Sequence, residues 1–207
     1  MKSLKYGVIV LSICAMALGC VPQRMPEEAR EKVPLSQVIP LITTQYQGAR
    51  TLQAHVSLKL EVQDEFYLLQ GFFLYENPAS LRLQLATNLG PTVGEMIYTD
   101  GFLMILVPSA ERIYQGRLQE TRQEEEVLSL VMSFQDYMDT EQGRFPARLY
   151  GETEGGVFRF ELRLKEPKID EPLPSGAFVP HTAGWEVHPL SDLKELLSYV
   201  RSGEKQR

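Results

Sequence analysis

Residues 54–62 have the sequence AHVSLKLEV, in which five apolar residues alternate with four polar ones. Side chains of neighbouring residues in a β-strand point to opposite faces, so this stretch predicts a strand with one apolar and one polar face. An apolar face of this kind has to be buried against another element. The stretch therefore predicts a sheet that covers a core with one of its faces.

Similar short stretches follow on both sides of a central interruption, and sequences typical of turns separate them, such as Asn77-Pro78 and Asp100-Gly101. The further strands are predicted over residues 66–75, 81–85, 95–99, 102–107, 112–115, 148–153, 157–165, 178–179 and 185–187. Because the connections are turn-length, we expect neighbouring strands to pair antiparallel.

Three segments have apolar residues at helical spacing. Residues 36–47 predict a helix that Ser36 caps, with Ile39, Ile42 and Tyr46 on one face. A second helix is predicted from Glu124 to Met138, because Val127, Val131, Phe134 and Met138 recur at helical spacing. A third is predicted to begin at Ser191 or Asp192 and to run to about residue 200.

Together these elements predict a mainly β fold with helices (α+β). Strands with one apolar and one polar face must bury the apolar face, so the sheet is expected to curve around a core. Three helices are too few to cover the sheet with a full second layer. An incomplete antiparallel β half-barrel covered by a helical lid satisfies both conditions.

The chain has 207 residues, a formal net charge of −6 and two cysteines. A nucleic-acid-binding protein usually has a net basic footprint, so no nucleic-acid partner is expected, and the overall charge gives no support for a basic membrane-binding patch. Two cysteines exclude a disulfide scaffold and a zinc site with several cysteines.

The first twenty residues predict export. Lys2 and Lys5 precede a charge-free, mostly apolar run over residues 6–18, which is too short to span a bilayer and is typical of a secretory signal. The sequence Ala17-Leu18-Gly19-Cys20 resembles the lipobox of bacterial lipoproteins. That resemblance implies cleavage before Cys20, acylation of Cys20 and membrane anchoring. A plain signal peptide that is cut nearby, or an uncleaved anchor, are the alternatives.

The organisation predicted from these features has four parts. Residues 1–19 are the lipoprotein signal peptide, and residues 20–34 are the lipidated cysteine with a proline-rich, charged tether. Residues 35–201 are the half-barrel domain, and residues 202–207 are a polar tail. In enteric-type lipoproteins the absence of Asp after the cysteine implies the outer membrane. Here Val21 follows Cys20, so the resemblance implies an anchor in the outer membrane with the domain facing the periplasm.

The run LRLQLATNLG at residues 81–90, followed by a strand that ends in Asp100-Gly101, resembles the LolA/LolB family of lipoprotein-sorting proteins. The order of helix and strands from about Ser36 to Val187 resembles that family too. The resemblance implies an open half-barrel whose apolar cavity takes the acyl chains of lipoproteins or lipids, with a periplasmic carrier protein as a further partner. It also implies that Leu89, on the loop, aids insertion of cargo into the membrane.

An acyl-binding cavity needs apolar side chains on the inward face of the strands. Our candidates for its lining are Val56, Leu58, Leu60, Leu83, Leu85, Ile97, Ile105, Phe158 and Phe160. The alternative for each of them is an ordinary core position, because alternating Leu and Val residues commonly form the core.

No pattern in the sequence predicts catalysis. The three histidines, His55, His181 and His188, do not have metal-ligand spacing, and no nucleophile elbow or phosphate-binding glycine loop occurs. We therefore expect no catalytic residue, no metal and no cofactor. The expected function is a non-enzymatic, membrane-anchored protein that binds acyl chains in lipoprotein localisation. The alternative is an envelope-assembly scaffold with a filled barrel core.

Overall fold

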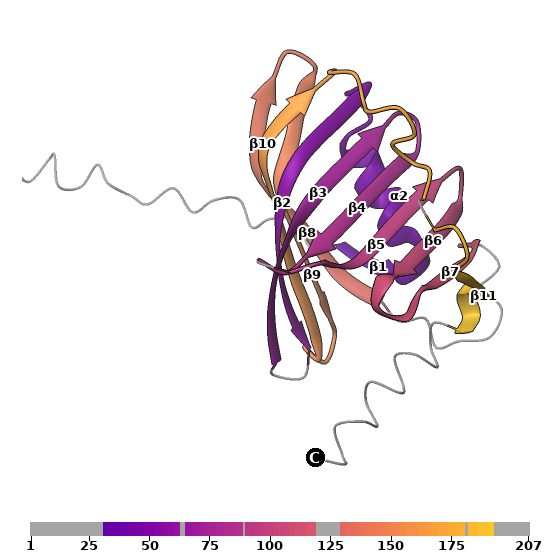
Figure 1. Ribbon diagram of the computed structural model, residues 1–207. Helices are drawn as coiled ribbons and strands as arrows, with labels where there is room; N and C mark the ends of the chain where they lie inside the picture. Colours follow the sequence, from indigo (N-terminus) through magenta and orange to yellow (C-terminus); the bar gives the residue numbers. More distant parts are fainter. Residues whose placement is uncertain (1–30, 63–64, 89, 119–128, 181, 193–207) are drawn as a thin grey trace, which may run out of the picture.

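The computed structural model describes residues 31–62, 65–88, 90–118, 129–180 and 182–192. These residues form one eleven-stranded sheet, and a single described α-helix lies against one of its faces (Figure 1). The two outermost strands, β1 and β11, are not hydrogen-bonded to each other, so the sheet is open. The predicted mainly β, antiparallel and unclosed fold is confirmed at this level.

The sheet consists of two meanders and two short edge strands. The first meander comprises β2 (Thr51–Val62), β3 (Glu65–Glu76), β4 (Ser80–Ala86), β5 (Thr92–Thr99), β6 (Phe102–Val107) and β7 (Arg112–Arg117). The second comprises β8 (Ser129–Thr140), β9 (Gly143–Thr153) and β10 (Phe158–Ile169), and the edges are β1 (Glu31–Pro34) beside β8 and β11 (Glu186–Pro189) parallel to β7. Two short 3₁₀ helices are η1 (Pro108–Ala110) and η3 (Leu190–Asp192).

A long antiparallel pairing joins the two meanders. It extends from Phe158 opposite Val62 to Ile169 opposite Leu52, with a register shift between Lys165 and Lys168. The polar side chains predicted for residues 54–62 therefore share one face of the sheet with those of β10. We call the face that carries the helix the inner face and the opposite one the outer face.

Helix α2 (Leu35–Gln45) buries Val38, Ile39 and Ile42 in the main core. Its predicted extent is confirmed to within two residues, but the predicted cap is wrong. Pro34 holds the cap position without a side-chain hydrogen bond, so Ser36 lies inside the first turn. The backbone of Pro34 is already paired in β1, and a proline directly before a helix has no amide hydrogen to satisfy.

Tyr46, just after α2, fixes the end of the helix on the sheet. Its ring lies 5.6 Å from that of Phe73 and 5.9 Å from that of Tyr75, and its hydroxyl donates to the carbonyl oxygen of Pro146 at 3.0 Å. Burial raises the pKa of the Tyr46 phenol far above its ordinary value, with Tyr137 as a smaller contribution. Burial also raises the pKa of Tyr75.

The predicted helix from Glu124 to Met138 is wrong wherever the structure describes it, because Ser129–Thr140 form strand β8. Leu130 and Met132 are buried and Phe134 is partly buried, so the apolar side chains alternate along this stretch as a strand requires. The apolar residues fit the helical period as well as the strand period, since Val131, Phe134 and Met138 also recur at helical spacing. The pairing with β1 and β9 shows that this stretch is a strand. Residues 119–128 lie outside the described part.

A third wrong prediction concerns residues 178–179, which are in a turn and not in a strand. They belong to a segment that we call the strap, residues 170–180, which crosses the outer face from the end of β10 towards β5. The strap is bound to β2 through Thr51 and Gln53, which donate to the carbonyl oxygens of Glu171 (2.7 Å) and Pro172 (3.0 Å). Arg82 Nη1 donates to the carbonyl oxygen of Ala177 at 2.6 Å.

The strap covers a second, smaller core on the outer face. Ile97, Leu106 and Ile113 are buried there, and Phe178 and Trp185 pack against them. Ile97 pairs with Arg82 and Met104 in the strand register, which places it on the outer face. The expectation that Ile97 lines an inner cavity is therefore wrong.

Asp170 fixes the beginning of the strap. Its backbone has a φ of +59°, and its Oδ1 accepts the amide hydrogens of Arg50 at 2.7 Å and of Thr51 at 3.3 Å. We expect Asp170→Ala to lower the free energy of unfolding by about 2 kcal/mol, because two amides lose their acceptor and alanine disfavours this φ. Asp170→Asn keeps an acceptor oxygen and tolerates positive φ, so it should cost less than about 1 kcal/mol. Urea unfolding of both variants measures the difference, and equal losses would contradict it.

Several predictions fall at the ends of the chain. The last four residues of the predicted tether, 31–34, form β1, while Cys20, the signal peptide and the polar tail lie outside the described residues. Ser191 and Asp192 belong to η3, and the rest of the predicted last helix also lies outside them. Within the described ranges, no helix is long and apolar enough to cross a membrane.

Candidate functional site

The inner face is buried to different degrees along its length. At one end, the register aligns Leu52, Tyr75, Leu81, Tyr98 and Leu103 across β2 to β6, and all five are buried. The next inner row, towards the other end of these strands, begins with the buried residues Ala54 and Phe73 and continues with partly exposed residues of β4 to β6. The inner face therefore becomes more exposed with distance from Tyr46 and the end of α2.

The partly exposed side chains form one continuous apolar surface, which we call the open inner patch. It extends over β2 to β6 and consists of Leu60, Leu69, Leu83, Leu85, Met96 and Ile105. Leu83 lies opposite Met96, and Met96 lies opposite Ile105. On the β10 side, Phe158 and Phe160 continue the same face opposite Val62 and Leu60, with their rings 6.1 Å apart.

Two glycines lie in the floor of this patch, and only one of them has free space beside it. Gly71 and Gly94 lie opposite Leu85 on either side of it, and both belong to the inner face. At Gly71 the backbones of β3 and β4 approach so closely that a Cβ atom would lie 1.7 Å from the carbonyl oxygen of Gln84. At Gly94 the nearest atom to such a Cβ would be 3.9 Å away.

Most of the predicted lining residues share the inner face. Val56 and Leu58 are buried in the core, whereas Leu60, Leu83, Leu85, Ile105, Phe158 and Phe160 are partly exposed on it. Ile97 is the exception described above, and Leu89 lies outside the described residues. Whether any of them contacts a ligand stays a prediction.

Sequence reasoning missed two members of the open inner patch. Met96 is the neighbour of Ile97, and choosing Ile97 inverted the face of that strand, because side chains alternate. Leu69 lies in a stretch of β3 where both faces carry apolar residues, so alternation gives no signal there. Met96 pairs with Leu83 and Leu69 pairs with Leu58, which places both residues on the inner face.

The six side chains of the open inner patch are all apolar, so its chemistry is that of a hydrocarbon surface. Tyr67 and Glu65, opposite Leu60 and Val62, follow Leu69 on the same face towards the start of β3. Arg82 does not face it: its Nε lies 2.8 Å from Glu95 Oε1 on the outer face, beneath the strap. Nor does His55, which lies on the outer face beside Phe72. His188 lies at the far edge near Glu186, and in the described part of the chain no three ligand-type side chains gather around a metal position.

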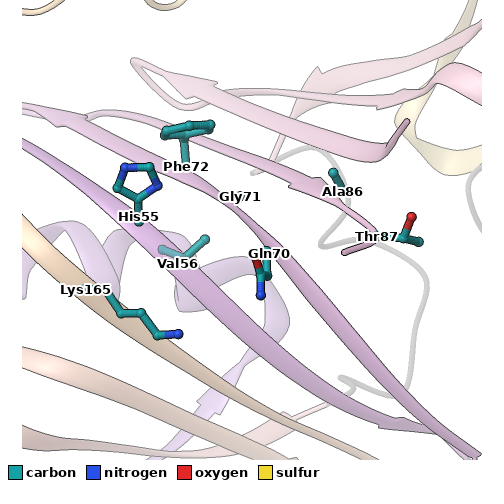
Figure 2. A pocket seen from close by; sticks show the side chains of 8 residues that line it. All are labelled: His55, Val56, Gln70, Gly71, Phe72, Ala86, Thr87 and Lys165. Carbon is teal, nitrogen blue, oxygen red and sulfur yellow. The ribbon is translucent and has the colours of Figure 1, made fainter. Parts of the chain in front are cut away.

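A shallow pocket with mixed, mostly apolar lining lies on the outer face. It has a volume of about 280 Å³ and is lined by residues of β10, β2 and β3 and of the end of β4 (Figure 2). The lining residues are His55, Val56, Gln70, Gly71, Phe72, Ala86, Thr87 and Lys165. Sequence reasoning did not group them, because their proximity depends on the pairing of β10 with β2.

No known family model matches this chain, and no curated protein is detectably similar in sequence. Solved structures with a similar fold include a DUF1329 family protein from Desulfovibrio piger, with 5% identity and a TM-score of 0.49 over 72% of this chain and 97% of that one. A LolA superfamily protein from Nitrosomonas europaea has 10% identity and a TM-score of 0.45, covering 69% and 97%. A putative outer membrane lipoprotein-sorting protein domain from Vibrio parahaemolyticus has 7% identity and a TM-score of 0.37, covering 68% and 95%. The superfamily that the sequence resembles is thus among the structural neighbours, and none of them singles out LolB.

Proposed function

We propose that this protein binds the acyl chains of a lipid or lipoprotein on the open inner patch, without chemical turnover. The observation that carries the proposal is the continuous row of partly exposed apolar side chains on the inner face, next to a well-filled core. A folded domain normally buries the inner face of a sheet. An open inner patch made only of apolar side chains fits a hydrocarbon ligand.

The energetics of such binding are favourable. Burying one methylene group contributes about 0.8 kcal/mol, so roughly ten methylenes of one acyl chain contribute about 8 kcal/mol before the entropic cost of association. Met96 adds an unbranched, adaptable side chain that accommodates chains of different shape. A headgroup would remain outside, since the patch offers it no polar partner.

The finer parts of the proposal concern location and partners. Acylation of Cys20 would anchor the domain to the outer membrane, facing the periplasm, and residues 31–34 would lie at the start of the folded body. Cargo would arrive from a periplasmic carrier protein and leave for the membrane near Leu89. Of the segments predicted to form a helical lid, residues 129–138 belong to strand β8, and residues 119–128 and 193–207 lie outside the described residues.

The alternative function is an envelope-assembly scaffold with a filled barrel core. The tight packing of Tyr46 against Phe73 and Tyr75 favours it, because this half of the inner face holds no space for a ligand. The two functions differ in whether the other half binds a hydrocarbon.

A binding measurement separates the two. We expect the chain of residues 21–207 to bind a fluorescent fatty-acid probe, and Leu85→Glu to weaken this binding at least about tenfold, because the carboxylate would have to be desolvated by the acyl chain. Val179→Glu is the matched control, since Val179 is an exposed apolar residue on the strap. Its affinity should equal that of the unsubstituted chain.

Two results would contradict acyl binding. One is a chain that neither binds the probe nor releases lipid into an organic extract analysed by mass spectrometry. The other is equal weakening by both substitutions. A tight protein partner together with a lipid-free extract would support the scaffold.

A further inference from the structure

The outer face of β3 carries an unusual row of exposed apolar side chains. Phe66 is 75% exposed, Leu68 is 61% exposed and Phe72 is 50% exposed. They lie on one face because they alternate with Tyr67, Leu69 and Gly71 along the strand. Gln70, which is also exposed, lies between Leu68 and Phe72 on this face. Single exposed apolar residues are common on proteins, whereas three large ones along one strand mark an interaction surface. We call Phe66, Leu68 and Phe72 the outer stripe.

Two lysines and a histidine lie beside this stripe on the same face. In the register of the sheet, Lys59 is opposite Leu68, His55 is opposite Phe72, and Lys165 is opposite His55. The rings of His55 and Phe72 are 4.7 Å apart. Glu61, opposite Phe66, and Glu161, opposite Lys59, lie on the same face and are paired with Arg159 and Arg163. The lysines therefore flank the Leu68 and Phe72 part of the stripe.

These lysines differ from the arginines of the same face in their partners. Arg159 lies 3.5 Å from both Glu61 and Glu152, and Arg148 Nε lies 3.0 Å from Asp136. By contrast, no described carboxylate forms an ion pair with Lys59 or Lys165. Their charges are available for an anion from outside the molecule.

The pocket of Figure 2 lies where the lysines and the outer stripe meet, and its polar groups come from four side chains. Figure 2 shows Lys165, His55, Gln70 and Thr87 around it, with the ring of Phe72 at its border. Its volume of about 280 Å³ is sufficient for a phosphate group with part of its glycerol. Lysine and histidine at such a place supply hydrogen-bond donors to phosphate oxygens.

We propose that the outer face of β2 and β3 docks on an anionic phospholipid bilayer, with the outer stripe in the interfacial region and a lipid phosphate in the pocket beside Phe72. Aromatic and aliphatic side chains flanked by lysines are what such an interface accepts. The formal net charge of the whole chain is −6. This total does not describe the local charge around Lys59 and Lys165, which is positive. The docking face is opposite to the open inner patch, so the proposal does not depend on acyl binding.

A second copy of the chain is the less suitable occupant of this face. The unpaired charges beside the stripe, on Lys59 and Lys165, are both positive, so the face offers no charge complement to itself. The bilayer supplies both the apolar phase and the negative charge.

Lysine footprinting of the full chain in vesicles tests the proposal. The chain is reconstituted in vesicles of phosphatidylcholine alone or with phosphatidylglycerol, labelled briefly with an amine-reactive acetyl ester and read by mass spectrometry. We expect labelling of Lys59 and Lys165 to fall about fivefold in the anionic vesicles. Lys32, on β1 at the far edge of the sheet, is the internal control and should not change. High salt should reverse the protection.

Two variants test whether the protection of Lys59 and Lys165 from labelling depends on the outer stripe. Leu68→Ser with Phe72→Ser should abolish most of the protection, whereas Val179→Ser removes an equally exposed apolar residue elsewhere and should preserve it. Circular dichroism and fatty-acid probe binding, which depend on the fold and on the opposite face, should stay unchanged in both.

Three results would overturn the proposal. The first is equal labelling of Lys59 and Lys165 in both kinds of vesicle. The second is the same loss of labelling at Lys32, which would indicate general proximity through the N-terminus. The third is protection without vesicles that grows with protein concentration, which would indicate a second copy on the stripe. Probe binding that fails while the protection persists would contradict the acyl-binding function alone.

Discussion

The substitution Gly71→Ala should lower the free energy of unfolding by about 3 kcal/mol or more. A Cβ atom at this position would lie 1.7 Å from the carbonyl oxygen of Gln84 and 2.8 Å from its carbonyl carbon. Both atoms belong to the backbone of β4, which cannot move aside as the end of a side chain can. Relief of the clash requires separating β3 from β4 where Gly71 pairs with Leu85 and Phe72 pairs with Gln84.

Gly94→Ala is the matched control for this prediction. Gly94 also lies opposite Leu85, on the other side of β4, and the nearest atom to its added Cβ would be Leu106 O at 3.9 Å. The substitution should change stability by less than about 1 kcal/mol, because the contact is ordinary and alanine restricts the unfolded chain more than glycine does. Urea unfolding followed by circular dichroism measures both variants. Equal stabilities would show that β3 and β4 do not approach closely at Gly71.

A loss of about 3 to 5 kcal/mol is expected for Arg82→Met. The side chains of Arg82 and Glu95 are only 17% and 9% exposed and form an ion pair of 2.8 Å. Arg82 also donates to the carbonyl oxygen of Ala177 in the strap. Its removal leaves the Glu95 carboxylate buried without a counter-charge and frees the strap at its midpoint, and the measurement is again urea unfolding.

Two further variants identify the cause of this loss. Arg82→Met combined with Glu95→Met should recover most of the stability, because no uncompensated charge then remains. Lys32→Met breaks an exposed pair, in which Lys32 and Glu154 are 57% and 68% exposed, and should cost less than about 1 kcal/mol. A double variant as unstable as Arg82→Met alone would mean that the strap contact, and not the buried charge, dominates.

The strands of the first meander could be predicted from the sequence because each has a polar and an apolar face. Residues 54–62 are the clearest case, and β2 contains all of them. The same rule failed in β8, where Leu130, Met132 and Phe134 fit a strand while Val131, Phe134 and Met138 fit a helix. Only the pairing with β1 and β9, which is a long-range property, separates the two.

The strap shows a different limit of sequence reasoning. Alternation assumes that one face of a sheet is buried and the other solvated, and this assumption placed Ile97 in the inner cavity. Phe178 and Trp185 cover the outer face of β5 to β7, so Ile97 and Leu106 are buried there. Nothing local in the proline-rich sequence around Pro172 and Pro174 indicates which strands it will cross. The apolar character of the candidate site could therefore be predicted from the sequence, whereas the residues that form it could be predicted only in part.

The pairing of β10 with β2 has a consequence for how the chain folds. Every other strand of the two meanders pairs with its neighbour in sequence, whereas this pairing joins residues roughly one hundred positions apart. Closing so long a loop is entropically costly, and the cost is met only when many contacts form together. The hairpins of each meander can form early through local contacts, and the joining of the two meanders then becomes the slow, cooperative step. Until it occurs, β2 and β10 expose long free edges, which makes this intermediate the species most prone to aggregation.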